Sequence, residues 1–444
     1  MMLFTTVLLA GLTSAAPALI SRQAATELNP WEITHASAGR PSGRPGSGTN
    51  SSLQINIKQP NTINLRQAPT GQAVLPSFEA SCSWTWVTAG NNFPVSVETL
   101  CSRIGTKPGS EQTYVAVKIS VAEPTRQNHE FTVLRAIAAA HSDEPGRGYL
   151  MTMQDYFQLD GPNGTHDCLV IEFLGPSVAD VLDAHSSIER LPGIVAKTIA
   201  KQILLGLNYL HEQEIGHADL HIRNIAFTVP SLHSLREEEL LQKLGIPETR
   251  PVQRKDRNPL ELGMPQYLVK PASYPADVNA PFTSIKIVDF GQSFLKDNTP
   301  DKFSIPLAVR APEVIFKDKV DYRMDLWSMG CTLFELIVGQ PLFDSFMTTP
   351  AILVQQMLET VGDDLPDRWQ KRWHVMNTAL SNEEYPHSLQ SWLEEMYFDG
   401  ERSEDLSRED IIRVGALVRS MIRLEPSARA SPKDILQDPW FREA

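Results

Sequence analysis

Cysteine is scarce in this chain, at four of 444 residues. That scarcity excludes a disulfide-dense scaffold, which needs far more cysteine for its length. Long apolar runs are missing too, because the best candidate, residues 3–12, falls well short of the roughly 20 residues of a spanning helix. We therefore expect no membrane span. Basic residues are outnumbered, 40 Lys and Arg against 53 Asp and Glu, and the net charge of −13 argues against direct nucleic-acid binding.

The charge that is present is spread unevenly along the chain. Residues 1–105 carry 6 basic and 4 acidic side chains, a net of +2, which leaves −15 on the other 339 residues. Charged side chains make up 10 of the first 105 residues and 83 of the 339 that follow. This change predicts two segments of different origin, joined between residues 101 and 113.

The N-terminal part is typical of a secreted protein. Residues 1–20 have an apolar stretch followed by small residues and Pro17, as in a signal peptide, although no Lys or Arg precedes the stretch; a buried helix is the alternative. Residues 23–70 are rich in Gly, Pro, Ser and Asn, and short strands are expected at 53–57 and 82–87, so residues 21–112 are expected to form a loop-rich β segment. Over residues 28–101 this loop-rich β segment resembles small secreted β proteins of filamentous fungi. The resemblance implies a disulfide between Cys82 and Cys101, which would be free thiols in a reducing compartment.

Four motifs follow the join in order: HADLHIRNI at 217–225, VDFG at 288–291, RAPE at 310–313 and DLWSMG at 325–330. A lone Asp before Leu-His or Phe-Gly is usually a turn or a helix cap. Here five motif residues lie 5, 65, 24 and 12 positions apart, namely Asp219, Asn224, Asp289, Glu313 and Asp325. In this order the motifs resemble a protein kinase, over residues 113–444. The resemblance implies an α+β fold with two lobes.

ATP and Mg²⁺ are the cofactors that the resemblance implies. Lys118, in a strand expected at 114–119, would hold the α- and β-phosphates and pair with Glu130, on a helix. The segment 168–175 fits the strand and hinge that take the adenine, with backbone groups from Glu172 to Leu174.

The resemblance also assigns the catalytic and metal-binding residues. Asp219 would orient the substrate hydroxyl and accept its proton. Asn224 and Asp289 would supply the oxygen ligands that Mg²⁺ prefers. Gly291 would let the backbone turn sharply after Asp289.

The remaining motif residues would brace the structure. Glu313 would form a buried ion pair with Arg429, Arg310 directly precedes Ala-Pro-Glu, and Asp325 begins the helix that anchors the catalytic loop. Residues 196–210 place apolar side chains at helical spacing, which predicts a core helix.

The catalytic loop departs from the kinase pattern at two positions. His221 replaces the usual Lys, and it could neutralise phosphate if the phosphate charge raises its pKa. Ala218 replaces the Arg that pairs with a phosphorylated activation loop. We therefore expect no control by phosphorylation at Thr299 or Ser304.

A Gly-rich loop before Lys118 is the largest missing element. The nearest glycines, Gly105 and Gly109, do not form G-x-G-x-x-G, and residues 89–93 are only a faint echo of it. We expect a truncated upper lobe that binds ATP weakly. A secreted-protein leader would have replaced the first kinase strands, by a true fusion or a faulty gene model.

Residues 230–283, rich in proline and charge, form a spacer that widens the gap between Asn224 and Asp289. Its position resembles the serine/arginine-rich-protein kinases, especially those of fungi, and implies Arg/Ser-rich, splicing-factor-like substrates. Residues 381–410 hold ten acidic and two basic side chains, either an acidic docking surface for such substrates or a solvated helix face.

Two other functions stay open. The chain could be a catalytically weak or silent binding module, because the Gly-rich loop is missing, or a secreted β protein fused to a passenger kinase. A working kinase predicts cytoplasm and nucleus, whereas the leader predicts the secretory pathway.

Overall fold

The computed structural model describes the backbone of strands at 9–10, 32–39, 50–59, 63–68, 71–75, 78–87 and 96–104. It further describes residues 114–120, 129–140, 144–161, 164–184, 190–229, 235–245, 249–254, 258–260, 267–269, 284–343, 348–377, 388–400, 402 and 404–442. The chain divides into two compact units. The first unit comprises residues 1–127, 152–174 and 229–275, and the second comprises 128–151, 175–228 and 276–444.

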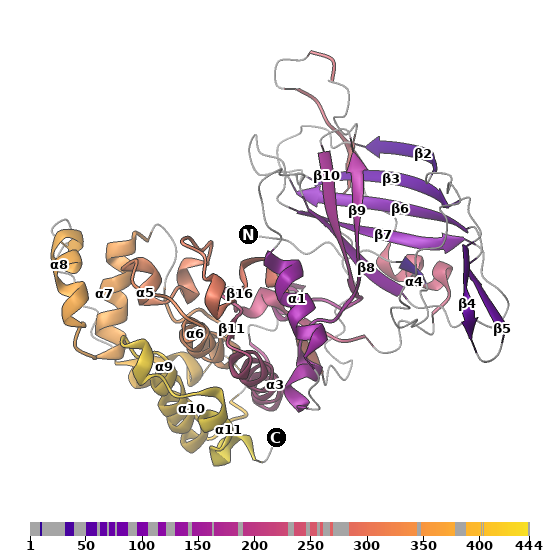
Figure 1. Ribbon diagram of the computed structural model, residues 1–444. Helices are drawn as coiled ribbons and strands as arrows, with labels where there is room; N and C mark the ends of the chain where they lie inside the picture. Colours follow the sequence, from indigo (N-terminus) through magenta and orange to yellow (C-terminus); the bar gives the residue numbers. More distant parts are fainter. Residues whose placement is uncertain are drawn as a thin grey trace. The chain divides into compact units, whose positions relative to one another are not determined.

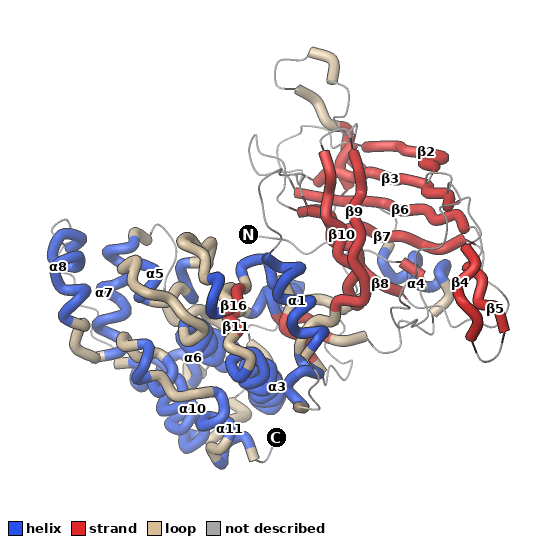
Figure 2. Tube along the Cα trace, in the orientation of Figure 1, coloured by secondary structure: helices blue, strands red, loops and turns tan. Residues whose placement is uncertain are grey.

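The first unit is built on an antiparallel sheet (Figure 2). Its strands are β1 (Leu9–Ala10), β2 (Glu32–Gly39), β3 (Asn50–Gln59), β6 (Phe78–Val87), β7 (Ser96–Ile104), β8 (Tyr114–Ser120), β9 (Met153–Gly161), β10 (Gly164–Glu172), β13 (Thr249–Pro251) and β14 (Tyr267–Val269). The order is β13-β14-β2-β3-β6-β7-β8-β10-β9, and β1 pairs with β8. A separate hairpin joins β4 (Ile63–Ala68) to β5 (Gly71–Leu75), and the unit also contains helix α4 (Glu237–Leu244).

The sheet continues past β8 on its N-terminal side. β7 pairs with β8, and β6 pairs with β7, both antiparallel. The strands expected at 53–57 and 82–87 are confirmed within β3 and β6. The connection at 88–95, with the faint motif, lies outside the described residues.

The expected join near residues 101–113 falls between two neighbouring strands of this sheet, β7 and β8. Cys82 and Cys101 are direct partners in the β6–β7 register. Facing Cα atoms in antiparallel strands are roughly 4.5 to 5.5 Å apart, a range that a disulfide can bridge. Their side chains lie outside what the structure describes, as does the leader at 1–20 apart from β1, so both stay predictions.

The second unit is mainly helical (Figure 1). Its helices are α1 (His129–Ala139), α2 (Val178–Ala184), α3 (Gly193–Glu212), α5 (Pro312–Ile315), α6 (Met324–Val338), α7 (Pro350–Val361), α8 (Asp367–Met376), α9 (Leu389–Tyr397), α10 (Arg408–Met421) and α11 (Pro432–Leu436). Short strands pair as β11 (Ile215–Gly216) with β16 (Phe294–Leu295), and as β12 (Ile225–Phe227) with β15 (Ile285–Ile287). Single 3₁₀ turns include η1 (Pro145–Tyr149), η2 (Ile222–Asn224), η4 (Phe290–Gln292), η5 (Lys296–Asn298), η6 (Leu307–Val309), η8 (Pro426–Ala428) and η9 (Pro439–Phe441). Among the described residues, none of the helices has the length and apolarity needed to cross a membrane.

Helices α3 and α6 form the core of the second unit. The helix predicted at 196–210 is confirmed within α3, where Ile199, Ile203 and Leu207 are buried. In α6 nearly every side chain is buried, so this helix is apolar on all sides, as a central helix must be. Gly330 permits that packing, because a Cβ atom there would lie 2.6 Å from Ile422 Cγ2 at the end of α10.

A buried ion pair ties the end of the chain to α5, as predicted. Arg429 donates two hydrogen bonds of 2.7 Å to the two carboxylate oxygens of Glu313. The two side chains are 0% and 1% exposed. Arg429 also donates to the backbone carbonyls of Arg323 and Arg423, both at 2.9 Å. These extra acceptors satisfy the guanidinium in a dry site, where an unpaired charge would be very costly.

We predict that Glu313→Gln destabilises the second unit by about 3 to 5 kcal/mol, because it leaves Arg429 buried without a counter-charge. Urea unfolding followed by circular dichroism measures the change. The control is Arg413→Gln, which breaks a partly exposed pair with Asp438 at 3.4 Å and should cost less than about 1 kcal/mol. Equal losses in both variants would contradict the bracing role of Glu313.

Candidate active site

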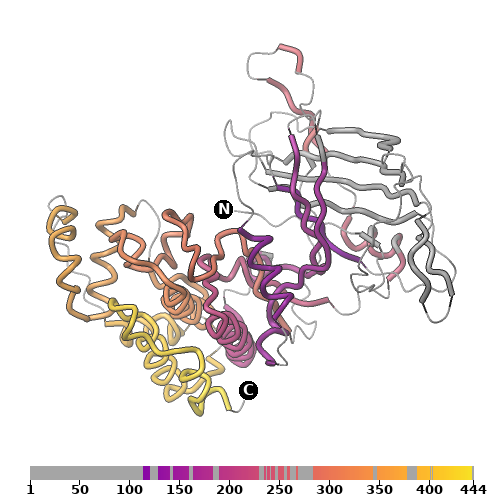
Figure 3. The backbone as a smooth tube through the Cα atoms, in the orientation of Figure 1, coloured from indigo at the N-terminus to yellow at the C-terminus, as the bar shows by residue number. Residues whose placement is uncertain are grey.

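The catalytic loop runs from β11 to β12 and lies beside the chain around residue 288 (Figure 3). The pairs β11–β16 and β12–β15 bring residues 215–227 against residues 285–295, two segments that are far apart in sequence. Val288 N donates to Asn224 O at 2.9 Å between them. The second and third motifs are thus held together by backbone hydrogen bonds.

Asp325, at the start of α6, fixes the beginning of the loop. Its Oδ2 accepts from His217 N and its Oδ1 from Ala218 N, both at 2.8 Å. His211 Nε2 lies 3.2 Å from Oδ2, and Asp325 is 0% exposed. This confirms the anchoring that the DLWSMG motif predicted. Ala218 has φ 62°, a left-handed conformation costly for a non-glycine residue, and the paired carboxylate holds it there.

His217 joins the loop to the VDFG motif. The side chain is fully buried, its ring lies edge-on to Phe290 at 5.1 Å, and Nε2 is 3.0 Å from Val288 O. Nδ1 accepts from Asp219 N at 3.3 Å, so the proton belongs on Nε2, which donates to Val288. The sequence reasoning assigned no role to this residue, although it opens the HADLHIRNI motif.

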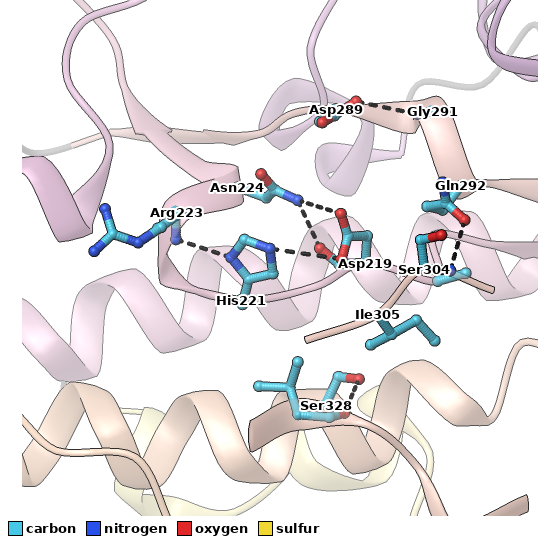
Figure 4. Close-up of polar contacts among 12 residues, drawn as sticks. Asp219, His221, Arg223, Asn224, Asp289, Gly291, Gln292, Ser304, Ile305 and Ser328 are labelled. Carbon is cyan, nitrogen blue, oxygen red and sulfur yellow. Dashed lines mark hydrogen bonds and ion pairs between the residues drawn. The ribbon is translucent and has the colours of Figure 1, made fainter. Parts of the chain in front are cut away.

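Asp219 and Asn224 meet as predicted (Figure 4). Asn224 Nδ2 donates to Asp219 O at 2.8 Å and to Asp219 Oδ2 at 3.1 Å. The amide oxygen of Asn224 therefore points away from Asp219 and can serve a cation. Asp219 Oδ1 is buried and accepts no hydrogen bond from the protein. A buried acceptor without a donor is costly, so this oxygen suits a hydroxyl that arrives with the substrate.

His221 lies beside the same carboxylate. Nδ1 accepts from Arg223 N at 3.2 Å, which leaves the proton of the neutral ring on Nε2. Nε2 lies 3.5 Å from Asp219 Oδ1, longer than an ordinary hydrogen bond. His221 thus presents a donor at the catalytic loop, where the pattern of the family has a lysine.

The turn after Val288 is made by Asp289, which corrects the role expected of Gly291. Asp289 has φ 61° and its carboxylate accepts from Gly291 N at 3.2 Å, whereas Gly291 lies inside η4 without a positive φ. Asp tolerates the left-handed conformation because its short side chain caps the turn. Among the described residues, three or more His, Cys, Asp or Glu side chains gather nowhere as a metal site. The expected site combines one carboxylate, from Asp289, with one amide, from Asn224.

Comparison with known proteins follows the same motifs. Residues 276–441 match the protein kinase domain family. A serine/threonine protein kinase of Aspergillus fumigatus is 25% identical over 358 residues, which cover 74% of this chain and 78% of the relative. The serine/threonine-protein kinase SRPK of Physarum polycephalum is 26% identical over 355 residues, which cover 74% of this chain and 80% of the relative. The serine/threonine-protein kinase Doa of Drosophila melanogaster is 24% identical over 299 residues, which cover 65% of this chain and 31% of the relative.

The match to the protein kinase domain lies entirely within the second unit. The two units, one β-rich and one helical, have the α+β character predicted for it. The enzyme class is an ATP-dependent protein kinase, and a divalent metal is implied with ATP.

Lys118 and Glu130, the residues predicted to pair at the ATP site, lie in different units. Lys118 is buried in β8, opposite Leu169 of β10, in the first unit. Glu130 is buried in the first turn of α1, in the second unit. Their pairing therefore stays a prediction. Glu172 ends β10 with its Oε1 accepting from Thr152 N at 2.7 Å, and Leu174 is buried just beyond it.

Hydrogen bonds hold the activation segment, which is the stretch between the VDFG and RAPE motifs at residues 292–310. Arg310 donates through Nε, at 3.0 Å, and through Nη2 to Ile305 O, and burial lowers the pKa of its guanidinium. Ser304 N donates to Gln292 Oε1 at 3.1 Å, and Ser328 Oγ donates to Val309 O at 2.9 Å (Figure 4). The segment is thus held at Ile305 and Val309 through their backbone carbonyl oxygens.

Glu335 is an ionisable residue near the catalytic loop whose burial the sequence did not predict. Burial raises the pKa of the Glu335 carboxyl, on α6, to about 7, while positive charge on His221 and Arg223 acts in the opposite direction. Burial of a single glutamate depends on its tertiary neighbours, which periodicity does not reveal.

We predict that the free energy of unfolding contributed by Glu335 is lost as pH rises from about 4.5 to about 7, because the folded state holds this proton more tightly than the unfolded chain. Glu335→Gln cannot ionise and should gain stability over the wild-type chain, on the order of 1 to 3 kcal/mol, between pH 5 and pH 8. Thermal unfolding of both proteins across this range measures it. Parallel pH profiles would contradict the raised pKa.

Proposed function

We propose that this kinase domain transfers the γ-phosphate of ATP to serine in Arg/Ser-rich proteins. The observation that carries the proposal is the spacer between Asn224 and Asp289, a separation of 65 residues at one defined point of the kinase sequence. The Physarum relative named SRPK aligns across 74% of this chain. The relatives from Aspergillus fumigatus and Physarum polycephalum are both named serine/threonine kinases, which supports serine as the acceptor.

The acceptor hydroxyl would be oriented by Asp219. Oδ2 is occupied by Asn224, so Oδ1 is the atom that accepts the hydroxyl hydrogen as the serine oxygen attacks the γ-phosphorus. His221 Nε2, 3.5 Å away, would donate toward the phosphate oxygens from the position of the usual lysine. Both groups stand on a loop that Asp325 fixes.

Nucleotide and metal would be held by the residues that the kinase motifs assign. Asn224 Oδ1 and the Asp289 carboxylate have the hard oxygens that suit Mg²⁺, which when bound neutralises phosphate charge. Lys118 would contact the α- and β-phosphates, with Glu130 as its counter-charge. The backbone of Glu172 and Leu174 would hydrogen-bond the adenine.

Recognition of arginine would rest on the acidic residues of 381–410. Several of its carboxylates are engaged within the protein: Asp405 accepts from Gly193 N and Tyr397 OH, and Asp410 accepts from Ser407 N and Oγ at the start of α10. Glu404 and Glu409 remain exposed. Exposed carboxylates steer cationic substrates and improve their association rate more than they improve affinity. We further propose that the kinase acts in the cytoplasm and nucleus, where such substrates occur.

The test is phosphate transfer from ATP to an Arg-Ser repeat peptide, with a Lys-Ser repeat of equal charge as matched substrate. We expect the Arg-Ser peptide to be preferred and Asp219→Asn to lower kcat by roughly 100-fold or more. Equal rates with both peptides would reject the Arg/Ser specificity. ATP-dependent thermal stabilisation without any transfer would instead favour a silent binding module.

A further inference from the structure

The spacer is folded onto the first unit. Its helix α4 lies in the same compact unit as β8 and β10, and β14, also from the spacer, pairs with β2 at Tyr267 and Gly39. An eight-residue helix is too short to be stable alone in water. Packing against the unit must therefore hold α4 in place.

The packing is a small apolar cluster drawn from three distant segments. Tyr114 at the start of β8, Phe173 just after β10 and Leu240 of α4 are 1%, 5% and 1% exposed. Val229, Leu235 and Leu244 flank them. Leu240 is thus the anchor of α4, on a helix whose outer residues are polar.

A hydrogen bond reinforces the cluster. Tyr114 OH donates to Leu235 O at 2.8 Å, across 121 positions of sequence. Leu235 directly precedes the N-cap of α4, where Arg236 N donates to Glu239 Oε2 at 2.9 Å. The start of the helix is therefore tied to the start of β8 both by an apolar contact and by a polar one.

Phe173 lies in the middle of the proposed adenine-binding segment. On one side Glu172 is fixed, because its N donates to Thr152 O at 3.0 Å and its Oε1 accepts from Thr152 N. On the other side Leu174 is 7% exposed. Holding the Phe173 side chain in the α4 cluster restricts the peptide groups on both sides of it, which are those that would meet the adenine.

We infer that α4 braces the hinge, and that Tyr114 and Leu240 are positioning residues for adenine binding. The inference rests on the proposed adenine role of Glu172 and Leu174. Through α4 the spacer controls nucleotide affinity. If α4 detaches from Tyr114 and Phe173, the backbone at residues 172–174 becomes free to move, and nucleotide binding must then order it at a cost in free energy.

The experiment uses the full chain and two ligands, adenosine and Mg·ATP, measured by isothermal titration calorimetry. Leu240→Ala should weaken both by the same factor, about 3- to 10-fold, because adenosine has only the adenine and ribose. Tyr114→Phe, which removes the hydroxyl alone, should weaken both by about 3-fold. In steady-state kinetics KM for ATP should rise by similar factors while kcat changes less than 2-fold.

Two variants serve as controls. Gln242→Ala changes an exposed side chain of the same helix and should leave both affinities unchanged. Leu240→Met keeps the apolar contact and should restore the affinity lost in Leu240→Ala.

The outcomes distinguish failure of the brace from failure of the proposed adenine-binding role of Glu172 and Leu174. Wild-type affinity for adenosine in folded Tyr114→Phe and Leu240→Ala would overturn the brace alone. Loss of ATP affinity with unchanged adenosine affinity would also overturn it, because the variants would then affect contacts with the phosphates and not with the adenine. Failure of the wild-type chain to bind adenosine would remove the hinge assignment itself. If Leu240→Ala does not fold, Tyr114→Phe decides.

Discussion

The carboxylate of Asp325 is the contact on which the active site depends. It accepts two consecutive backbone N–H groups, from His217 and Ala218, in a site with no solvent exposure. Hydrogen bonds to a charged acceptor are among the stronger ones in proteins, and here they hold a left-handed alanine. Asp219 is the next residue after Ala218, so its position depends on that of α6. The helix itself is placed by close packing at Gly330 and by Arg429, whose guanidinium lies 5.4 Å from the Trp327 ring. The packing of α6 thus sets the position of the Asp219 carboxylate through the Asp325 side chain.

The same loop explains how the activation segment keeps its shape. With Ala218 where many kinases have arginine, no loop cation is available at this position to pair with a phosphate. The segment relies instead on the β11–β16 pair and on contacts to backbone oxygens, such as those from Arg310 and Ser328.

Much of the site could be predicted from sequence, because motif residues at fixed spacing carry both identity and order. The Glu313–Arg429 pair and the meeting of Asp219 with Asn224 follow from that order. The strands expected at 53–57 and 82–87 lie within β3 and β6, whereas β7 was not predicted, because strand pairing depends on backbone and tertiary context more than on local sequence. The left-handed turn at Asp289, rather than at Gly291, is a local choice that residue preference alone predicts wrongly. The packing of α4 depends on Tyr114, 121 positions before Leu235, beyond the reach of any local pattern.

The division of the chain into units has a consequence for synthesis. The chain passes from one unit to the other at residues 127, 151, 174, 228 and 275, so neither unit is contiguous. As the polypeptide leaves the ribosome, Tyr114 and Phe173 emerge well before Leu240, which covers them in the finished protein. Until then the growing sheet carries exposed apolar side chains and unpaired strand edges, features that favour aggregation of nascent chains. Contacts of such long sequence separation also form slowly. The spacer is therefore the piece that completes the first unit, and translation must pass residue 240 before that unit can close.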